Sequence, residues 1–521
     1  MKNIYKYIVI AALALTGLSS CIKESINEDP NNPKDVPSNM LMSGAQKWIM
    51  DNIYDVWFSG RQCMLYAQYW AQRNYTEEDR YQIRESVNNG YFNYLYMGVA
   101  NLIKVEKLNT DPDFADLNSI YGANCNQIAA AKILKVWLMD IITDTWGSVP
   151  YSDVAKLDSD GVFYCKYDDQ KALYDTLIDE LTEAVNMIDE NEPAFVSGDV
   201  IYGGDASAWK KFGNSLKCRL AVHISKVDPS WKSIIAEAVS SGVFESNDDA
   251  ATYKYSSSGT DYCKFYEGYY EDGRNDLTIA KPFFNLMAGI ADIDNRKTHP
   301  WEGVRDPRLD IFSPGAEAGM PYGAPSQYST SIRAKAPNWY SQQPGHLVKD
   351  AMVPLMTYAE LQFILSEYNG FSDAEFQEGV TASIDFWADA YGISVDDDAV
   401  AEYLAAVGTA TAEKVSIQKY IDLWLNGTEA WTEIRRTGYP DQLLHPGETT
   451  GYYNGTPLTF TPLSDVKNMI IPRVKYPTNE STLNGENWKA AVAKLKDGTN
   501  NYYSQMFWDV RTSAYDHPTN K

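Results

Sequence analysis

The chain has 521 residues, of which 44% are hydrophobic and 13% aromatic, and its formal net charge is −25. This hydrophobic share can bury a large core, which excludes disorder over most of the chain. The acidic balance argues against a nucleic-acid-binding protein, because no excess of basic residues can neutralise phosphates. Tyrosine is in excess, with 37 residues against 17 Phe and 14 Trp. Such amphipathic rings suit a wet binding surface, although the rim of a helical core also accommodates them.

The first 20 residues have the pattern of a bacterial lipoprotein signal peptide. Two lysines precede an apolar run at residues 8–18. This run is shorter than the about 20 residues that span a bilayer as a helix. It ends in LSSC, which resembles a lipobox with Cys21 as the lipidated residue. We therefore predict a signal peptide at 1–20, a lipid anchor on Cys21 and a flexible leader at 21–40. An ordinary secretory cleavage site beside an incidental cysteine is the alternative.

The remaining cysteines do not suggest a disulfide framework or a zinc site. They are odd in number and widely spaced, and no CxxC pair occurs. We expect most of them to be small core residues: Cys63, Cys125, Cys165, Cys218 and Cys263. No segment after the leader is long and apolar enough to span a membrane, so we expect membrane attachment through the lipid alone.

From about residue 41 onward, apolar residues recur at helical spacing. The predicted helices are 57–71, 173–188 with Asp168 as N-cap, 209–220 after Asp205, 357–370 with a Thr357–Glu360 capping box, and 417–424. Paired helices with short connections favour an α-solenoid of tetratricopeptide type, but no regular 34-residue consensus repeats.

Residues 251–350 have a different composition. They contain 17 Gly and Pro against 8 in residues 151–250, and aromatic residues cluster among them. Irregular segments of this kind carry function more often than the elements they connect. We predict one domain at 41–521, with a helical scaffold at about 41–250 and 350–435. A loop-rich capping region is expected at about 251–350 and 440–521.

The catalytic templates are absent from the sequence. It contains no HExxH, GxSxG or GxxxxGK. His223 lies in a helical pattern and is expected in the core. A DSDG stretch at 158–161 hints at a calcium loop, but the EF-hand register fails because it starts on Lys156 and ends on Tyr167. These templates therefore give no support to a zinc-protease, hydrolase-elbow or P-loop interpretation, and we predict no cofactor and no metal site.

Several motifs follow one another in a fixed order along the chain. They are WGSVPYSDVA at 146–155, WKKFGNSLKCRLA at 209–221, DPRL at 306–309, TYAE at 357–360 with SEY at 366–368, QKY at 418–420, EAWTEIRRTGYP at 429–440 and IPR at 471–473. Together they resemble the SusD/RagB family of nutrient-binding outer-membrane lipoproteins of Bacteroidetes-type bacteria. Ser148 and Asp153 depart from the family pattern, as does SEY, where the family more often has AEA.

The resemblance implies a mostly α-helical, SusD-like fold with a tetratricopeptide-type helical-repeat scaffold and long irregular loop insertions. It also implies a protein at the cell surface, anchored by lipid in the outer membrane, that performs no chemistry. Such a protein captures oligosaccharides or oligopeptides and acts as the lid of a SusC-like TonB-dependent transporter. An extracytoplasmic glycoside hydrolase and a structural helical-repeat interaction lipoprotein are the alternatives.

Sugar recognition requires an aromatic platform beside polar side chains, whereas peptide recognition depends more on backbone and amide groups. Our candidate ligand-binding residues are Trp70, Asn74, Tyr75 and Tyr81, with Tyr266, Trp301, Trp339 and Tyr340 across the cleft. If the tryptophans contact the ligand, Trp70→Ala or Trp339→Ala should weaken binding and leave the melting temperature nearly unchanged.

Overall fold

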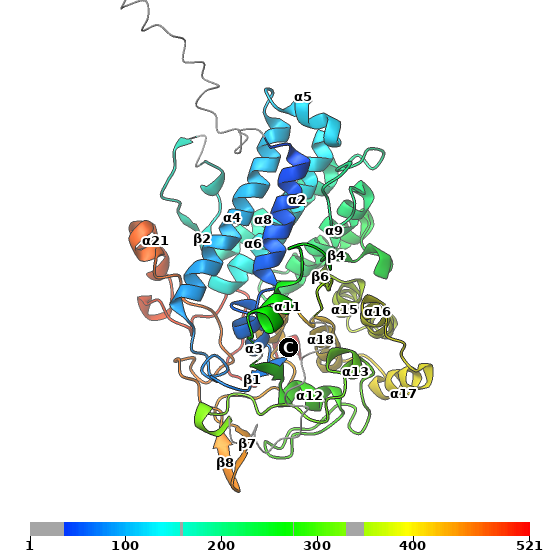
Figure 1. The fold of residues 1–521 in the computed structure, drawn as a ribbon, viewed down its shortest axis with the longest axis vertical. Coiled ribbons are helices and arrows are strands. Elements are labelled where there is room, and N and C mark those ends of the chain that lie inside the picture. The colour runs from blue at the N-terminus through cyan, green and yellow to red at the C-terminus, as the bar shows by residue number, and fades with distance from the viewer. Residues whose placement is uncertain (1–35, 157–159, 275, 330–347, 521) are drawn as a thin grey trace, which may run out of the picture.

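Long helices stacked side by side form the first half of the molecule. The computed structural model describes residues 36–156, 160–274, 276–329 and 348–520. Helices α2, α4, α6, α8, α9 and α10 each pack on the next one along the chain (Figure 1). The signal peptide, Cys21 and most of the leader lie outside the described residues. The bounds of these helices are Ser38–Ile53, Glu85–Thr110, Asn124–Trp146, Gln170–Met187, Ala206–His223 and Trp231–Ser241.

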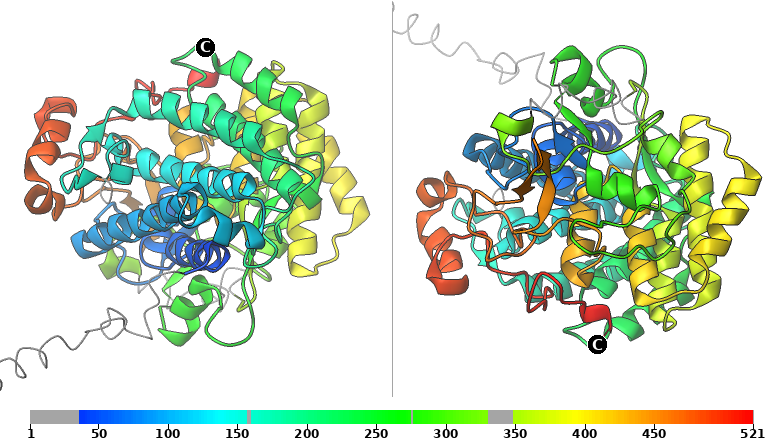
Figure 2. Two further views of the ribbon diagram at one scale, coloured as in Figure 1. Left: turned by 90° about the horizontal axis from the view of Figure 1, so that it is seen from above. Right: turned by 90° about the horizontal axis from the view of Figure 1, so that it is seen from below.

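A second group of helices continues the stack. Helix α15 packs on α9, α16 and α18, and α18 packs on α19. Seen from above, the two groups form one continuous helical array, whereas the view from below shows irregular segments and the β7–β8 hairpin (Figure 2). The bounds are α15 Tyr358–Tyr368, α16 Asp373–Tyr391, α17 Asp397–Val407, α18 Ala412–Asp422 and α19 Gly427–Thr437.

Capping residues define where several helices begin. The Asp205 side chain accepts hydrogen bonds from the backbone N–H groups at the start of α9, and Thr357 Oγ1 accepts one from Glu360 N at 3.0 Å. The sequence predicted Asp168 as the N-cap of α8, but the N-cap is the next residue, Asp169. The Asp168 carboxylate instead accepts hydrogen bonds from the backbone N–H groups of Tyr151 and Ser152 at 2.8 and 2.9 Å.

The predicted helix at 57–71 does not form as one element. A short π-helix, η2 (Ser59–Cys63), and one helical turn, α3 (Met64–Tyr66), are followed by strand β1 (Trp70–Gln72). Gln68 has a φ of +57°, which interrupts the helix before the strand. Trp70 therefore lies on a strand that pairs antiparallel with β5 (Leu277–Ile279), not on a helix.

Short strands and helices make up the irregular part of the molecule. Four two-stranded antiparallel sheets are present in the described residues, in the pairs β1–β5, β2–β3, β4–β6 and β7–β8. The remaining bounds are α5 Ala115–Asn118, η3 Ser119–Tyr121, β2 Val149–Pro150, η4 Val154–Lys156, β3 Tyr167–Asp168, η5 Asn247–Asp249, β4 Ala251–Lys254, α11 Lys264–Tyr266, η6 Glu267–Glu271, α12 Lys281–Met287, α13 Arg308–Phe312, β6 Met352–Met356, β7 Thr449–Tyr453, β8 Thr456–Thr459, α20 Glu480–Leu483, α21 Gly485–Val492, η8 Lys496–Gly498 and η9 Pro518–Asn520.

The buried side chains form one contiguous hydrophobic core that extends from Met42 to Trp508. Close approach between helices is possible where a side chain is missing, since a Cβ at Gly98 of α4 would lie 2.7 Å from Ile49 of α2. The prediction of a mostly α-helical repeat scaffold with irregular insertions is confirmed. The five cysteines of the described part are free thiols. None of the helices in the described ranges has the length and apolarity that crossing a bilayer requires.

Candidate ligand-binding site

Three tyrosines at intervals of four residues contact one another, one just before the short α11–η6 segment and two on it. The ring centroids of Tyr262 and Tyr266 are 6.1 Å apart, and those of Tyr266 and Tyr270 are 4.8 Å apart. Tyr270 is 41% exposed, and the other two are half-buried. We refer to these three residues as the tyrosine column. Their partly exposed rings suit stacking against the apolar face of a ligand.

A lysine from a distant part of the chain lies over the column. Lys349 Nζ is 5.3 Å from the ring centroid of Tyr262 and 5.4 Å from that of Tyr266. These distances are typical of cation–π contacts, which restrain the ammonium group near the ring faces. The column therefore combines apolar ring surface with hydrogen-bond donors on a flexible side chain.

Buried residues pack beneath the segment that carries the tyrosine column, on the side towards the core. Phe265 lies on the same segment, and its ring centroid is 5.2 Å from that of Trp70. Gly268 allows the segment to lie close to the loop after α2, because a Cβ there would be only 2.3 Å from Val56 Cγ2. In Figure 1, α11 lies beside the lower end of α2. The column thus lies on buried, closely packed residues.

Trp57 connects the tyrosine column to a neighbouring cavity. The guanidinium carbon of Arg274 lies 5.0 Å from the Trp57 ring centroid, and the Arg274 backbone N–H donates to the Gly268 carbonyl at 2.8 Å. Arg61 approaches the same ring at 5.2 Å and forms a buried ion pair with Asp276 at 2.6 Å. These contacts fix Trp57 next to the segment that carries the column.

The cavity beside Trp57 lies between the end of α2 and the start of α4. Its volume is about 210 Å³, and its lining is mainly apolar and aromatic. We refer to it as the Trp57 cavity; Asn52, Asp55, Trp57, Phe58, Ser86, Val87, Gly90, Tyr91 and Tyr94 line it. A concave aromatic site with a few polar groups is the usual form of a small-ligand pocket.

Burial changes the ionisation of groups around this site. It raises the pKa of Asp55 to about 6, although backbone N–H groups of the following residues oppose the shift. It also raises the pKa of Tyr270, and the neighbouring Tyr266 adds to that shift. The column hydroxyl of Tyr270 is therefore neutral at physiological pH and can donate a hydrogen bond.

The β1–β5 pairing brings the loop after Trp70 next to the loop that carries the column. Arg73 N donates to the Asp276 carbonyl at 2.6 Å. Farther along, Thr76 N donates to Ser326 Oγ at 3.1 Å, so residues just before the gap at 330–347 also adjoin this loop. Asn74 is half-buried here and Tyr75 is 67% exposed. Both remain available to a ligand.

The structure places three of the predicted site residues in the core. Trp70 is 1% exposed and contacts Trp424 in addition to Phe265. Tyr81 packs against Tyr66 and Phe460, and Trp301 packs against Tyr403. Neighbouring side chains cover the rings of Trp70, Tyr81 and Trp301. The prediction that these three rings present a face to a ligand is therefore wrong. Trp339 and Tyr340 lie outside the described residues.

Tyr266 is the predicted residue that lies at the centre of the tyrosine column. Tyr262 and Tyr270 were not among the candidates, although their four-residue spacing from Tyr266 was visible in the sequence. Trp57 and Tyr94 were also missed. Trp57 lies in the turn after α2 and Tyr94 lies 37 residues later on α4, and no local pattern indicates that they line one cavity.

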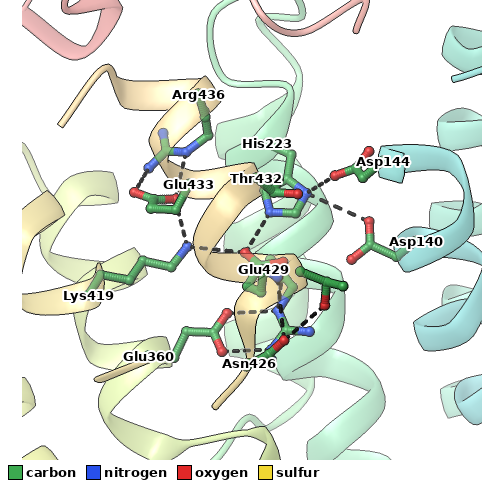
Figure 3. A network of polar contacts seen from close by, with 12 residues as sticks. Asp140, Asp144, His223, Glu360, Lys419, Asn426, Glu429, Thr432, Glu433 and Arg436 are labelled. Atoms are coloured by element: carbon green, nitrogen blue, oxygen red, sulfur yellow. Dashed lines mark hydrogen bonds and ion pairs between the residues drawn. The ribbon is translucent and has the colours of Figure 1, made fainter. Parts of the chain in front are cut away.

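A buried polar network forms the other dense group of titratable residues (Figure 3). His223 Nε2 lies 2.9 Å from Glu429 Oε1, and its Nδ1 lies 3.6 to 3.7 Å from carboxylate oxygens of Asp144 and Asp140. Ligand atoms of the two aspartates and His223 lie within 4.8 Å of one another, as metal ligation would require. Arg219, Lys419 and Arg436 supply positive charges to the same network.

This network connects helices and does not open onto the tyrosine column. Arg219 of α9 forms a 2.6 Å ion pair with Glu360 of α15, and Arg436 of α19 forms a 2.7 Å ion pair with Glu367 of α15. Burial alone would lower the pKa of His223, but Glu429 and Asp140 outweigh burial and raise it to about 10. Nδ1 of His223 also lies 3.1 Å from the Tyr174 hydroxyl oxygen, so both ring nitrogens have hydrogen-bond partners. His223 is therefore a satisfied core residue.

Fold and site together define a helical-repeat protein with an aromatic surface suited to ligand binding. Residues 30–459 match the family model for SusD-like proteins, which is described as "Starch-binding associating with outer membrane". The chain therefore belongs to the SusD-like family, which confirms the resemblance noted in its motifs.

Solved structures of the same fold cover nearly the whole chain. A SusD homologue from Parabacteroides distasonis superimposes with a TM-score of 0.71 at 21% identity, covering 91% of this chain and 98% of that one. One from Bacteroides uniformis gives 0.68 at 24% identity, with 92% and 100% coverage. A chitin-binding SusD homologue from Flavobacterium johnsoniae gives 0.68 at 22% identity, with 91% and 99% coverage. No curated protein matches the chain.

Proposed function

We propose that this protein is a cell-surface lipoprotein that captures oligosaccharides and acts as the lid of a SusC-like TonB-dependent transporter in the outer membrane. The tyrosine column is the observation that carries the binding part of this proposal. The family description and the chitin-binding homologue support a glycan as the ligand class. Lipidation of Cys21 would anchor the protein, since the described helices include none that could do so.

The chemistry of the column suits a sugar chain. The rings of Tyr262 and Tyr266 are inclined to each other by 80° and those of Tyr266 and Tyr270 by 38°, so the column offers ring faces and edges at different angles. The C–H-rich faces of sugars stack on such aromatic rings. Hydroxyl or acetamido groups at the edges of the sugars would accept hydrogen bonds from Lys349 and from the tyrosine hydroxyls. Beyond Arg274, the Trp57 cavity has the volume to take one end of the sugar chain.

An oligopeptide is the second ligand class. A peptide is recognised mainly through its backbone groups, either at an exposed strand edge or by amide side chains. The tyrosine column offers ring faces and a lysine instead, so the site favours the glycan.

Calorimetric titration with two glycans tests the binding site. We expect N-acetylchitohexaose or maltoheptaose to bind, and we expect Tyr266→Ala and Tyr270→Ala each to weaken binding about tenfold. This corresponds to about 1.4 kcal/mol, the upper range for one aromatic contact beyond its buried area. The matched control is Tyr164→Ala, because Tyr164 is a strongly exposed tyrosine away from the column.

Two results would contradict the proposed site. Equal affinity of the wild type and both column variants would remove the column from the binding surface. Binding of a mixed oligopeptide library, with neither glycan bound, would identify the ligand as peptide. Turnover of either glycan during the titration would favour the hydrolase alternative.

The lid role is tested by purification from outer membranes. The full-length lipidated protein should co-purify with a large β-barrel transporter in stoichiometric amounts. Cys21→Ala should release the protein from the membrane fraction, because one lipid-modified residue provides the anchor. Membrane retention of that variant would argue against lipid anchoring.

A further inference from the structure

The size of the Trp57 cavity limits what can enter it. Its volume of about 210 Å³ lies below the about 300–1,000 Å³ of pockets that enclose drug-sized molecules, so the cavity holds about one sugar unit. The end of α2 and the start of α4 form it, at the end of the helical array where α11 also lies (Figure 1). A glycan on the tyrosine column can therefore place one unit in the cavity while its other units lie on the rings.

Ring contacts form two walls of the Trp57 cavity. On the core side, Tyr91 stacks on Phe58 with ring centroids 3.7 Å apart and an interplanar angle of 11°. On the α2 side, the Trp48 ring meets the Tyr94 ring at 5.8 Å, and Trp48 Nε1 donates to the Tyr94 carbonyl at 2.7 Å. A sugar unit inside the cavity therefore meets packed rings on two sides, and these rings end the path of a chain that comes from the column.

Two polar groups of the cavity wall accept hydrogen bonds. Asp55 Oδ1 accepts from the backbone N–H groups of Phe58 and Ser59 at 3.0 and 3.1 Å, which fixes the carboxylate and leaves acceptor capacity at Oδ2. Asn52 donates from Nδ2 to the Trp48 carbonyl at 2.7 Å, so its Oδ1 remains an acceptor. A ligand group that pairs with either side-chain oxygen must donate.

Two hydroxyl groups complete the polar part of the wall. Tyr91 is 3% exposed, and its hydroxyl has no hydrogen-bond partner among the described residues. Leaving a buried hydroxyl unpaired costs free energy, which a ligand oxygen within reach would recover. Ser86 adds an exposed hydroxyl that can donate or accept. The cavity thus combines acceptors and donors, as the hydroxyl groups of one sugar unit require.

A terminal sugar unit differs from an internal unit in the group that it offers to this wall. At its free end it carries a hydroxyl, where an internal unit carries a second glycosidic bond. A hydroxyl donates a hydrogen bond, whereas a glycosidic oxygen can only accept one. An internal unit would therefore leave the Asp55 carboxylate without that donor. It would also need a second exit from the cavity for the rest of its chain.

From these observations we infer that the Trp57 cavity binds the terminal unit of a glycan, so that the protein captures linear chains by one free end. This inference rests on the proposed glycan-binding function and narrows its substrate class. The tyrosine column holds the following units, and the Arg274 guanidinium, which lies over the Trp57 ring, is placed between the two. Asp55 accepts a hydrogen bond from a hydroxyl of the terminal unit. Chains blocked at that end are poor ligands.

Filling the cavity tests whether a sugar unit enters it. Gly90 of α4 lines the cavity, and the nearest atoms to a Cβ there belong to the Tyr94 ring, at 3.4 Å and beyond. Gly90→Leu therefore places a side chain in the cavity, and leucine suits a helix better than glycine does. In calorimetric titrations with N-acetylchitohexaose and maltoheptaose, the glycan that the wild type binds should bind Gly90→Leu at least about tenfold more weakly.

Gly44→Leu is the matched control for the filled cavity. Gly44 is an exposed glycine of helix α2, and a Cβ there would meet no atom within 4 Å. The same substitution at this position should leave the affinity for the glycan unchanged. Melting temperatures of both variants report whether they fold. If Gly90→Leu melts below the wild type, Ser86→Leu takes its place, because Ser86 is an exposed residue of the cavity wall.

End-blocked glycans test whether the bound unit is a terminal one. The glycan that binds is coupled to a branched polyethylene glycol, either at its reducing end or at its non-reducing end. One of the two conjugates should bind the wild type at least about tenfold more weakly than the free glycan, because its end no longer enters the cavity. The other conjugate should keep the affinity of the free glycan. In the filled-cavity variant, both conjugates should bind as the free glycan does.

The outcomes separate the inference from the proposed function. Binding of neither glycan to the wild type would overturn the proposed glycan-binding function and the inference with it. Wild-type affinity in the filled-cavity variant would show that no sugar unit enters the cavity, and would overturn the inference alone. Equal affinity of the free glycan and both conjugates for the wild type would show that the site takes internal units, and would overturn it too.

Discussion

At the scale of single residues, aromatic side chains of similar type have opposite roles in this protein. Trp70 and Tyr75 are five positions apart, but Trp70 is covered by Phe265 and Trp424 whereas Tyr75 projects from the surface. The sequence does not distinguish them, because both occur in the same polar and aromatic stretch. Only the pairing of β1 with β5 shows which ring faces inward.

Trp70→Ala should therefore act on stability rather than on ligand contact. We expect a loss of about 3–5 kcal/mol in the free energy of unfolding, the usual cost of removing a buried Trp ring. This reverses the expectation from sequence that the melting temperature would stay nearly unchanged. Urea unfolding followed by circular dichroism measures the effect.

Tyr75→Ala is the control for that measurement. Its exposed ring makes few packing contacts, so its free energy of unfolding should stay within about 0.5 kcal/mol of the wild type. A Trp70→Ala protein as stable as Tyr75→Ala would show that the Trp70 ring is not part of the core.

At the scale of elements, helices with a clear apolar period and a capping side chain were predictable from the sequence, whereas the longest helices, α4 and α6, were not among the predicted ones. Helices α9 and α15 have local signals, namely an apolar period and a capping side chain at Asp205 or Thr357. The region at 57–71 has an apolar pattern too, but Gly60 packs against the Trp70 ring and Gln68 takes a left-handed conformation. Such tertiary contacts override a local helical preference.

The position of the α11–η6 segment depends on Gly268. In Gly268→Ala, the new methyl group would lie 2.3 Å from Val56 Cγ2, so the segment must move away from the loop after α2. We expect glycan affinity to fall about tenfold, because the tyrosine column moves with its segment. Calorimetric titration measures this loss.

A second substitution distinguishes displacement of the α11–η6 segment from a general loss of folding in Gly268→Ala. Val56→Ala removes the γ-methyl groups that the new Cβ would meet, and should restore most of the affinity in the Gly268→Ala background. If the double variant binds no better than Gly268→Ala alone, the contact between Gly268 and Val56 does not position the column.

At the scale of the whole molecule, the motifs that identified the family turn out to be scaffold. Asp306 and Arg308 of the DPRL motif form a buried ion pair at 2.7 Å. Arg435 of α19 donates to the carbonyls of Asp144 and Pro472 at 2.8 and 2.9 Å, so it joins α6 to the C-terminal segment. These contacts determine the fold, which explains why the sequence predicted the architecture better than the binding site.

The proposed binding site was harder to predict because it combines segments that have no shared pattern. Lys349 reaches the tyrosine column from a position 83 residues after Tyr266. The proximity of these residues depends on how β4 and β6 pair, since Cys263 N donates to the Lys349 carbonyl at 2.9 Å just beyond that sheet. Tertiary pairing of this kind has no local signature in the sequence.

The buried network should make the stability of the whole molecule fall at alkaline pH. Glu429 and Asp140 raise the pKa of His223 to about 10 against the opposing effect of burial, whereas an unfolded histidine titrates near 6.5. The native state therefore binds one more proton than the unfolded state between these values. The contribution of His223 is complete below about pH 6.5 and is lost as the pH rises towards 10.

Comparison with His223→Gln isolates this contribution. Between pH 7 and 9, the free energy of unfolding of the wild type should fall more steeply than that of the variant, by up to about 1.4 kcal/mol per pH unit for one proton. Buried thiols such as Cys63 and Cys218 also oppose ionisation in the native state, but they affect both proteins equally. Urea unfolding at several pH values measures the two slopes. Parallel slopes would mean that His223 is already neutral in the folded protein, and that Glu429 and Asp140 do not hold its proton.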